Sequence, residues 1–569
     1  MAGCGGDAGN DLNNLRPAKG GRNYGGTFRM NEVQELRVLD PVGLNDAPSH
    51  HAVHQIAELL VDIRPDSINV LQPELAERWE VSPDGLTYTY HLRRGVKFQD
   101  DACFPEGKGR LMTATDVKYC FDRSLDARAG TVGIGYFRDK VKGAQDYFEA
   151  TRSNGKTPIP TGGVAGFRAV DDSTFVIDLL KPFAAFKYYP ALGCCYIYPR
   201  EAVEHYGKDF PRHLVGTGPF VFDHWSSGQE LVMKRNPNYW RRDSHGNQLP
   251  FLDAVSFTFI KDEKQQLAEV ASGNLEEAYR IPSELFPQVV DANGKGKGDY
   301  AKFTIHRVEA LSTQFYGMLC TSPEFKDRRV RQAFNYAIDR DQIVRYTLQG
   351  QAAGAATHGL VPPSMPGYDS KGVRGYSYNL DTARALMAAA GYPGGKGFPA
   401  VSIQLNNGGG RNLLVAQAMQ QMLSKLGVNV GLKQLEWPQH QEALENGRAP
   451  LYRLGWVADY PDPENFLNLF NSRTIPASGP SQINSARYAN PAFDSLLTLA
   501  IGTLDDAERM RLYQQAEQVA VDDAPMIFIY NDMDFRVVQP YVQNYFSNSM
   551  DRRDLTEVWF ASTTGEKNG

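Results

Sequence analysis

The stretch that decides the fold is GWVADYPDPENF, residues 455–466. It continues the run LYRLGW, residues 451–456, which predicts a short buried strand. Trp456 and Asp459 therefore stand at the end of that strand, directly before a Pro-rich turn. Because open α/β sheets bind their ligands at the ends of strands, this stretch is a candidate ligand site.

Asp459 is the first candidate binding residue. A carboxylate enclosed beside a Trp is costly unless a cation meets it, so an ammonium group is a natural ligand. The alternative is that DYPDP is only a turn in which Asp459 and Asp462 cap their own backbone. From these residues alone the turn is the better interpretation. The motifs elsewhere in the chain favour the binding role of Asp459 instead.

Length and composition set the class of protein. A chain of 569 residues is too long for one ordinary core, so two or three lobes are expected. The net charge of -6 is mild and spread along the chain, without the basic stripe that nucleic acid requires. The chain has no run of eighteen or more apolar residues, and its cysteines show no CxxC spacing, which argues against metal and redox sites.

The N-terminal residues 1–24 are rich in Gly and Asn and predict a flexible leader. Within them, Ala2-Gly3-Cys4 resembles the cleavage site of a bacterial lipoprotein, in which Cys4 is lipidated. The apolar segment that precedes such a site is missing, and for the tripeptide alone chance is the better explanation. The last residues, 561–569, are predicted to be a disordered tail.

The chain also shows local patterns of helices and hairpins. Residues 50–63 have apolar residues at helical spacing, and their His cluster is predicted to be an exposed helix start. Residues 87–92 and 96–98 alternate as strands near a Pro-Asp-Gly turn.

The second half alternates strands and helices. The strands are VSIQLNN, VNVGLKQLEW and LYRLGWVADY, and helical segments lie between them. Short parallel strands joined by such crossovers form a doubly wound sheet. Trp437 and Asp459 both follow strand ends, so they are expected to face one crevice.

Three motifs carry a resemblance to a known family. They are DGLTYTYHLRRGVKFQD followed by TATDVKYCFDR, the string GTGPFVFDHWSSGQELVMKRNPNYW at residues 216–240, and GWVADYPDPENF. The chain resembles the family 5 extracellular solute-binding proteins, the oligopeptide- and dipeptide-binding receptors of bacterial ABC importers. The resemblance covers roughly residues 25–560 and implies an amphipathic helix over residues 331–345.

This resemblance implies an α/β, periplasmic-binding-protein-like fold of cluster C type. Two mixed-sheet lobes would close around a crevice, with an extra small lobe, and chains crossing between lobes would act as hinges. The expected parts are a first lobe of residues 25–50, 205–285 and 535–560, an accessory lobe of residues 51–204, and a lobe of residues 286–534 with the doubly wound sheet.

The resemblance also implies roles for particular residues. Asp459 would receive the N-terminal ammonium of a peptide, with Trp456 packed beside it and the Gly455 backbone paired with the peptide. Arg453 and Arg411 would meet its carboxylate. Further expected contacts come from Trp437, from the aromatic residues Phe315 and Tyr316, and from Glu35 or Glu32 of the first lobe.

Each of these residues has a plainer alternative. Arg453 could pair with a core carboxylate, Arg411 could be a solvated helix start, and Trp437 and Phe315 could be ordinary core. Some peptide receptors of the family carry a Cys pair at the positions of Val457 and Ser312, and this chain lacks both cysteines.

The sequence therefore predicts a receptor that captures peptides and delivers them to an ABC permease by hinge closure. We expect a monomer without catalysis, cofactor or metal, held at the periplasmic or extracellular face by a lipid anchor only. Alternative ligands for the same fold are an oligosaccharide, a nickel chelate or haem. A hydrolase using Asp459 with Asp462 or Glu464 is the alternative of another class, and their crowding on one turn argues against it.

Overall fold

A computed structural model describes residues 12–407 and 409–562 of this chain. The chain forms two compact units. Unit 1 takes the residues up to 281, residues 288–306 and the residues from 536 onward, whereas unit 2 takes residues 282–287 and 307–535. Two of the passages from one unit to the other fall inside long strands, β14 (Thr304–Met318) and β19 (Met526–Val538).

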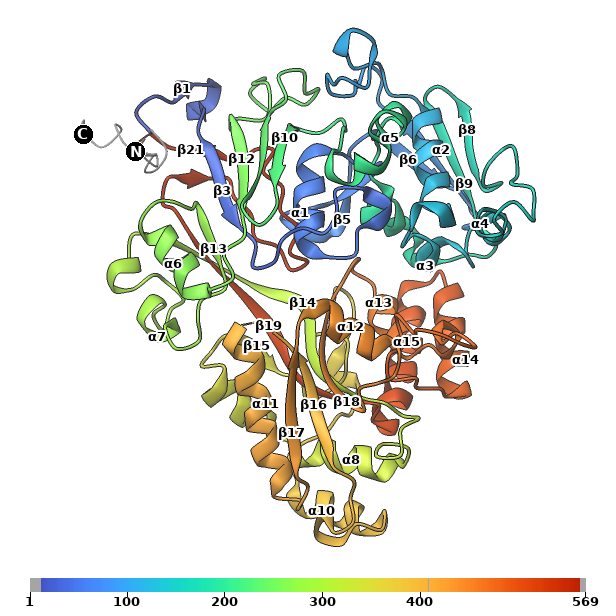
Figure 1. Ribbon diagram of the computed structural model, residues 1–569, viewed down its shortest axis with the longest axis vertical. Coiled ribbons are helices and arrows are strands. Elements are labelled where there is room, and N and C mark those ends of the chain that lie inside the picture. Colours follow the sequence, from blue (N-terminus) through green and yellow to red (C-terminus); the bar gives the residue numbers. More distant parts are fainter. Residues whose placement is uncertain (1–11, 408, 563–569) are drawn as a thin grey trace. The chain divides into compact units, whose positions relative to one another are not determined.

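The first sheet of unit 1 has the order β10-β11-β12-β3 (Figure 1). The motif at residues 216–240 forms its hairpin, β10 (Phe220–Ser226) and β11 (Glu230–Arg235). β12 (Ala254–Thr258) is antiparallel to β11 and parallel to β3 (Thr27–Asn31). This sheet joins segments more than two hundred residues apart in the chain.

The second sheet of unit 1 is antiparallel, in the order β6-β7-β9-β8. The Pro83-Asp84-Gly85 turn joins β6 (Ala76–Val81) to β7 (Thr87–Leu92), a different pair of strands from the predicted 87–92 and 96–98. β9 (Thr174–Asp178) and β8 (Phe167–Asp171) complete the sheet. The expected strand at residues 96–98 is wrong, since only an isolated bridge forms between Lys97 and Leu111. The chain turns away after β7 at Gly95, whose φ is +83°.

Unit 1 contains further helices and short strands. The helices are α1 (Ala47–Ile56), α2 (Ala114–Arg123), α3 (Ile134–Phe137), α4 (Ala144–Arg152), α5 (Arg200–Tyr206) and α6 (Glu263–Ala271). The short strands are β1 (Arg16–Pro17), β2 (Asn23–Tyr24), β4 (Val61–Arg64), β5 (Ser67–Pro73), β13 (Glu277–Tyr279), β20 (Val542–Gln543) and β21 (Trp559–Phe560).

The histidines of α1 correct a prediction. His51 and His54 are only 2% and 8% exposed, so the expectation of an exposed helix start is wrong for them. His51 Nδ1 lies 2.8 Å from Glu32 Oε1, and its Nε2 lies 2.6 Å from the carbonyl oxygen of Asp551. These partners come from distant parts of the chain, which a local pattern cannot reveal.

The main sheet of unit 2 follows the predicted alternation of strands and helices. β16 (Val401–Asn406) is parallel to both β17 (Val430–Leu435) and β18 (Leu451–Val457), and β14 is antiparallel to β18. The crossovers are α11 (Gly409–Ser424) and α12 (Trp437–Glu445). Figure 1 shows β16, β17 and β18 running side by side with α11 along them.

The rest of unit 2 encloses this sheet. β15 (Ala352–Ala355) pairs with β19, and β19 lies next to β14. The other helices are α8 (Arg328–Ala337), α9 (Arg340–Gln342), α10 (Leu380–Ala389), α13 (Glu464–Leu467), α14 (Pro491–Gly502) and α15 (Asp506–Asp523); the short α7 (Phe286–Val289) lies where the chain returns to unit 1. Side chains of β14, β16, β18, β19, α8, α10 and α11 form the core.

The predicted single helix at residues 331–345 is interrupted. α8 ends at Ala337, Ile338 is extended, and a new helix begins at Arg340 with the Asp339 side chain accepting from the Gln342 N–H. Arg340 is 3% exposed, and its guanidinium donates to the carbonyl oxygens of Phe528 and Asn335. The interruption places this cation where backbone oxygens compensate its burial.

No helix within residues 12–407 and 409–562 has both the length and the apolar character that a membrane span requires. The predicted lipidation residue, Cys4, lies outside the described residues. The five described cysteines are free thiols, with Cys194 and Cys195 buried as expected for core residues.

Candidate ligand-binding site

The central strand of unit 2, β18, is open along part of one edge. It pairs with β14 along its whole length, from Leu451 to Val457. On the other side, the described residues of β16 pair with it only at Leu451 and Tyr452. The backbone of β18 beyond Tyr452 is therefore not covered by β16, although β18 lies in the middle of the sheet.

His440 marks the point where this pairing stops. Its Nε2 lies 2.9 Å from the Arg453 carbonyl oxygen, and its Nδ1 lies 3.3 Å from the Gln404 amide nitrogen. Burial lowers the pKa of His440 to about 4, so the imidazole is neutral near pH 7. The contacts fix its tautomer, because Nε2–H must donate to the carbonyl oxygen and Nδ1 must accept from the amide.

Asn465 holds the two leading candidate residues together. Its side-chain oxygen accepts from the Trp456 indole N–H at 2.8 Å and from the Asp459 backbone N–H at 3.1 Å. Its amide nitrogen donates to Asp459 Oδ2 at 3.2 Å. A buried side chain on α13 thus sets the direction of both the indole and the carboxylate.

The two other acids of this turn serve the structure. Asp462 Oδ1 accepts from the Glu464 backbone N–H at 3.0 Å, as a turn cap does, and Asp462 Oδ2 lies 3.7 Å from the Arg509 guanidinium. Glu464 accepts from the Tyr460 hydroxyl. Both carboxylates are 2% exposed. A hydrolase that uses either of them with Asp459 therefore has little support in this geometry.

Arg411 lies in the first turn of α11, and its side chain is only 13% exposed. Its guanidinium donates to Gln351 Oε1 at 2.7 Å and to Asp532 Oδ1 at 3.3 Å. The alternative of a solvated helix start is therefore wrong.

Arg453 on β18 is half-buried and donates to Asn406 Oδ1 at 3.2 Å and to the Gln314 side-chain oxygen. Gln314 in turn donates to Asp532 Oδ2 at 2.6 Å, so the two arginines belong to one network. These two partners of the Arg453 guanidinium are amide oxygens.

Gly455 permits this network to form. A Cβ atom at this position would come within 2.3 Å of Gln314 Oε1, the oxygen that accepts from Arg453. A side chain at this position would displace the Gln314 amide, so glycine permits its close approach to the β18 backbone.

The aromatic candidates occupy different environments. Trp437 is half-buried at the start of α12, where its ring stacks on His440 with centroids 5.8 Å apart. Phe315 and Tyr316 on β14 are 0% and 2% exposed, and Tyr316 belongs to the core of unit 2. Their predicted contact with ligand stays a prediction, and their burial fits the core alternative.

The acidic candidates of unit 1 differ from each other. Glu32 is 5% exposed and already contacts His51 and, at 3.5 Å, the Arg553 guanidinium. Glu35 is half-buried, and within the described residues its Oε1 is buried without a hydrogen-bond partner. Of the two, Glu35 is the one with an acceptor still to be satisfied.

Sequence reasoning missed the supporting residues Asn465, His440, Gln314, Gln351 and Asp532. One signal was available, because Asp532 follows closely on the apolar run of residues 526–530, and an acid in a buried strand must find a partner. The described residues contain no group of three or more His, Cys, Asp or Glu side chains arranged to hold a metal ion.

The family description "Bacterial extracellular solute-binding proteins, family 5 Middle" matches residues 70–477 of the chain. The chain belongs to this family. It is 31% identical to heme-binding protein A of Haemophilus influenzae, over 89% of this chain and 87% of that protein. It is 28% identical to the periplasmic oligopeptide-binding protein OppA of Escherichia coli, over 91% and 89%.

Solved structures of solute-binding proteins share the fold. The DppA protein of Helicobacter pylori in complex with the peptide STSA aligns with a TM-score of 0.78 at 24% identity, covering 95% of this chain and 99% of that one. OppA of Haemophilus influenzae in complex with RPPGFSPFR aligns with a TM-score of 0.77 at 24% identity, covering 94% and 99%. These likenesses confirm the predicted fold class.

Proposed function

We propose that this family 5 solute-binding protein captures peptides along the open edge of β18. The observation that carries the proposal is the early end of the β16–β18 pairing, next to a carboxylate held at the end of the same strand. An extended peptide can add to such an edge by main-chain hydrogen bonds. This mode tolerates different side chains, because it binds what every peptide has in common.

Asp459 supplies the partner for the N-terminal ammonium group of the peptide. A carboxylate that is oriented before binding loses little entropy when the ligand arrives, and Asn465 provides that orientation. The Trp456 indole is fixed by the same amide, so it forms a rigid wall beside the ammonium site. The pair also selects direction, since only one end of a peptide is cationic.

The network of Arg453 and Arg411 receives the carboxylate end or acidic groups of the ligand. This network joins two guanidinium groups with the carboxylate of Asp532 through the Gln314 side chain. A guanidinium binds a carboxylate through two parallel hydrogen bonds. Arg411 also forms an ion pair with Asp532, which holds its guanidinium in place.

Relatives support the peptide class. OppA and the dipeptide-binding protein of Escherichia coli are each 28% identical to this chain, over about nine tenths of its length. By the same reasoning we propose an ABC permease as the partner, a monomeric receptor outside the cytoplasm, and a lipid anchor at Cys4.

Haem is a second candidate ligand, because heme-binding protein A is 31% identical to this chain. The two candidates differ in what they demand of Asp459. A peptide brings a cation to this carboxylate, whereas a haem brings two carboxylates and would be repelled by it.

The experiment is native mass spectrometry of the purified protein, followed by mild denaturation and identification of whatever is released. We expect a mixture of short peptides with free N-termini. Release of haem, a sugar or a metal chelate as the single ligand would overturn the peptide assignment and leave membership of the family intact.

A further inference from the structure

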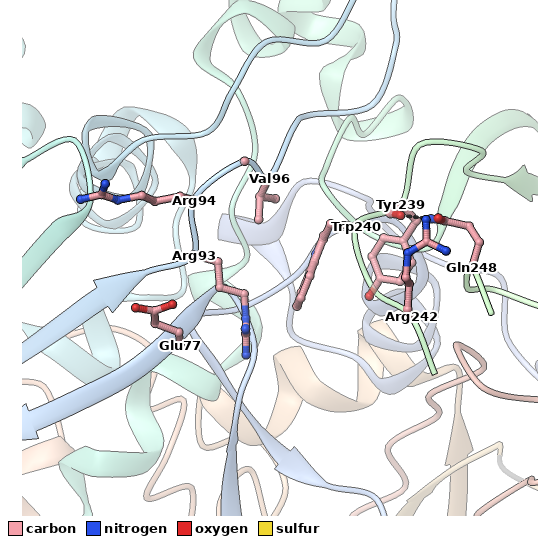
Figure 2. A pocket seen from close by; sticks show the side chains of 9 residues that line it. Glu77, Arg93, Arg94, Val96, Tyr239, Trp240, Arg242 and Gln248 are labelled. Carbon is pink, nitrogen blue, oxygen red and sulfur yellow. Dashed lines mark hydrogen bonds between the residues drawn. The ribbon is translucent and has the colours of Figure 1, made fainter. Parts of the chain in front are cut away.

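Unit 1 contains a hollow of about 610 Å³, between the turn after β7 and the chain that follows β11 (Figure 2). Its lining includes Trp240 and three arginines, Arg93, Arg94 and Arg242. Figure 2 shows these three arginine side chains extending in different directions, so their guanidinium groups do not meet at one point. The hollow therefore offers a ligand no common charged site, whereas the open edge of β18 in unit 2 presents backbone groups in a regular order.

The backbone groups of β18 alternate between the two edges of the strand. At one end of the pairing with β14, the Ala458 N–H donates to the Leu311 carbonyl oxygen at 2.9 Å. At the other end, the Leu319 N–H donates to the Pro450 carbonyl oxygen at 2.9 Å. The register between these two bonds is unbroken, so the even-numbered residues of β18 face β14. The odd-numbered residues therefore turn their N–H and C=O groups to the opposite edge.

Three odd-numbered residues lie beyond the last pair with β16, namely Arg453, Gly455 and Val457. The Arg453 carbonyl oxygen is already used, because it accepts from His440 Nε2 at 2.9 Å. Its N–H faces Gln404, the last paired residue of β16. Within residues 12–407 and 409–562, by contrast, no hydrogen bond is found on this edge for the backbone of Gly455 or Val457. These two residues are where a ligand strand can pair.

His440 is not free to give up its bond to Arg453. Its side chain is fully buried, and its Nδ1 lies 3.3 Å from the Gln404 amide nitrogen. The ring also stacks on Trp437, with centroids 5.8 Å apart. A peptide N–H that took the Arg453 carbonyl would leave the imidazole N–H buried without an acceptor. That loss costs more than the new hydrogen bond contributes.

We propose that His440 is a positioning residue that ends the pairing of a bound peptide with β18 after Gly455. The proposal rests on the proposed function, in which the peptide ammonium group meets Asp459 and the peptide runs antiparallel to β18. Asp459 stands two residues beyond Val457, which places the first peptide residue opposite Val457. The third residue then lies opposite Gly455, and the fifth lies opposite Arg453.

The consequence is a limit on main-chain recognition. The third peptide residue exchanges two hydrogen bonds with Gly455, as directly opposite residues of an antiparallel pair do. The N–H of the fifth residue finds the Arg453 carbonyl occupied by His440. Main-chain pairing with β18 therefore ends at the third residue, and a longer peptide leaves the strand edge beyond it.

The test is an N-methyl scan of one defined ligand, a hexapeptide of five alanines and a C-terminal lysine. N-methylation removes one main-chain N–H, at the third or at the fifth residue in separate peptides. Calorimetry measures the affinity of each peptide for the full-length wild type and for His440→Ala, which removes both the donor and the ring. Gln439→Ala is the matched control, since Gln439 is the exposed neighbour on α12. His440→Gln restores a donor for the Arg453 carbonyl, and circular dichroism checks the folding of each variant.

We expect methylation at the third residue to weaken binding to the wild type about tenfold, and methylation at the fifth residue to leave it unchanged. In His440→Ala the fifth position should become sensitive, with a loss of about fivefold, and His440→Gln should return to the wild-type pattern.

Two results would overturn the role of His440 and leave peptide binding intact. In the first, methylation at the fifth residue weakens binding to the wild type as much as methylation at the third does. In the second, His440→Ala is folded and stays insensitive at the fifth residue. If His440→Ala does not fold, the wild-type scan decides alone. Failure of the unmodified hexapeptide to bind, or equal binding of its N-acetylated form, would instead contradict the proposed function, and the role of His440 would fall with it.

Discussion

The amide nitrogen of Asn465 donates to the carboxylate of Asp459 across 3.2 Å, while the amide oxygen accepts from the backbone N–H of the same aspartate. The buried Asn465 side chain thus holds Asp459, the candidate partner of an ammonium group, through two hydrogen bonds. The carboxylate is set before a ligand arrives, which is what a binding site needs to avoid an entropic cost.

Substitution of Asn465 by Ala should weaken peptide binding about tenfold, because Asp459 and the Trp456 indole both lose their common partner. Isothermal titration calorimetry with a peptide released from the protein measures this. Asn446→Ala is the matched control, since Asn446 is an exposed amide at the end of α12. Equal peptide affinities of the two variants would show that Asn465 does not contribute to peptide binding.

Arg411 and Asp532 permit a test that separates stability from binding. Arg411→Met leaves the buried Asp532 without its cation and should cost about 3 kcal/mol of unfolding free energy. Adding Asp532→Asn removes the unpaired charge and should recover much of that stability. Denaturant titrations follow the recovery.

The double variant should bind peptide as tightly as the wild type if Arg411 only pairs with Asp532, whereas Arg453→Gln should bind more weakly. A double variant that is stable but has lost binding would instead assign the ligand contact to Arg411.

Glu517 should make unit 2 less stable as the pH rises. Burial raises its pKa from 4.5 to about 7, although it accepts from the Tyr368 hydroxyl and the Leu360 and Val361 N–H groups. The folded state therefore holds this proton more tightly than the unfolded state. The stability that the protonated Glu517 contributes is complete below pH 4.5 and is lost as the pH rises to about 7. This loss is on the order of 3 kcal/mol. Thermal unfolding of Glu517→Gln should lack that decline relative to the wild type.

His440 should have the opposite effect in an overlapping window. Burial lowers its pKa from 6.5 to about 4, so the unfolded state binds the proton more tightly. Its contribution to stability is present above pH 6.5 and is lost as the pH falls to about 4. His440→Gln keeps a donor for the Arg453 carbonyl and should remove this loss. An unchanged slope on the acid side would show that His440 is not buried as a neutral group.

The sequence predicts the framework of unit 2 well. The predicted strand at 451–456 is observed at Leu451–Val457, and the alternation of strands and helices around it is local information that hydrophobic periodicity carries. The position of Asp459 just after a strand end, beside a Trp, is confirmed, and its contact with a ligand stays a prediction.

The contacts of these residues were not predictable in the same way. The partners of Arg411 lie 60 and 121 positions away, at Gln351 and Asp532. Contacts between residues so far apart produce no periodic pattern in the sequence. The β16–β18 pairing ends where His440, on α12, hydrogen-bonds to the Arg453 carbonyl oxygen. The break after Ala337 was missed because Arg340 finds its carbonyl partners partly on β19.

The most direct test of the account compares one peptide with its N-acetylated form. The peptide is the most abundant one released from the protein, and calorimetry measures its affinity for the wild type and for Asp459→Asn. We predict that acetylation weakens binding to the wild type about 100-fold, whereas Asp459→Asn binds both forms weakly and nearly equally. Equal binding of the two forms by the wild type, or full affinity in Asp459→Asn, would contradict the pairing of Asp459 with an ammonium group.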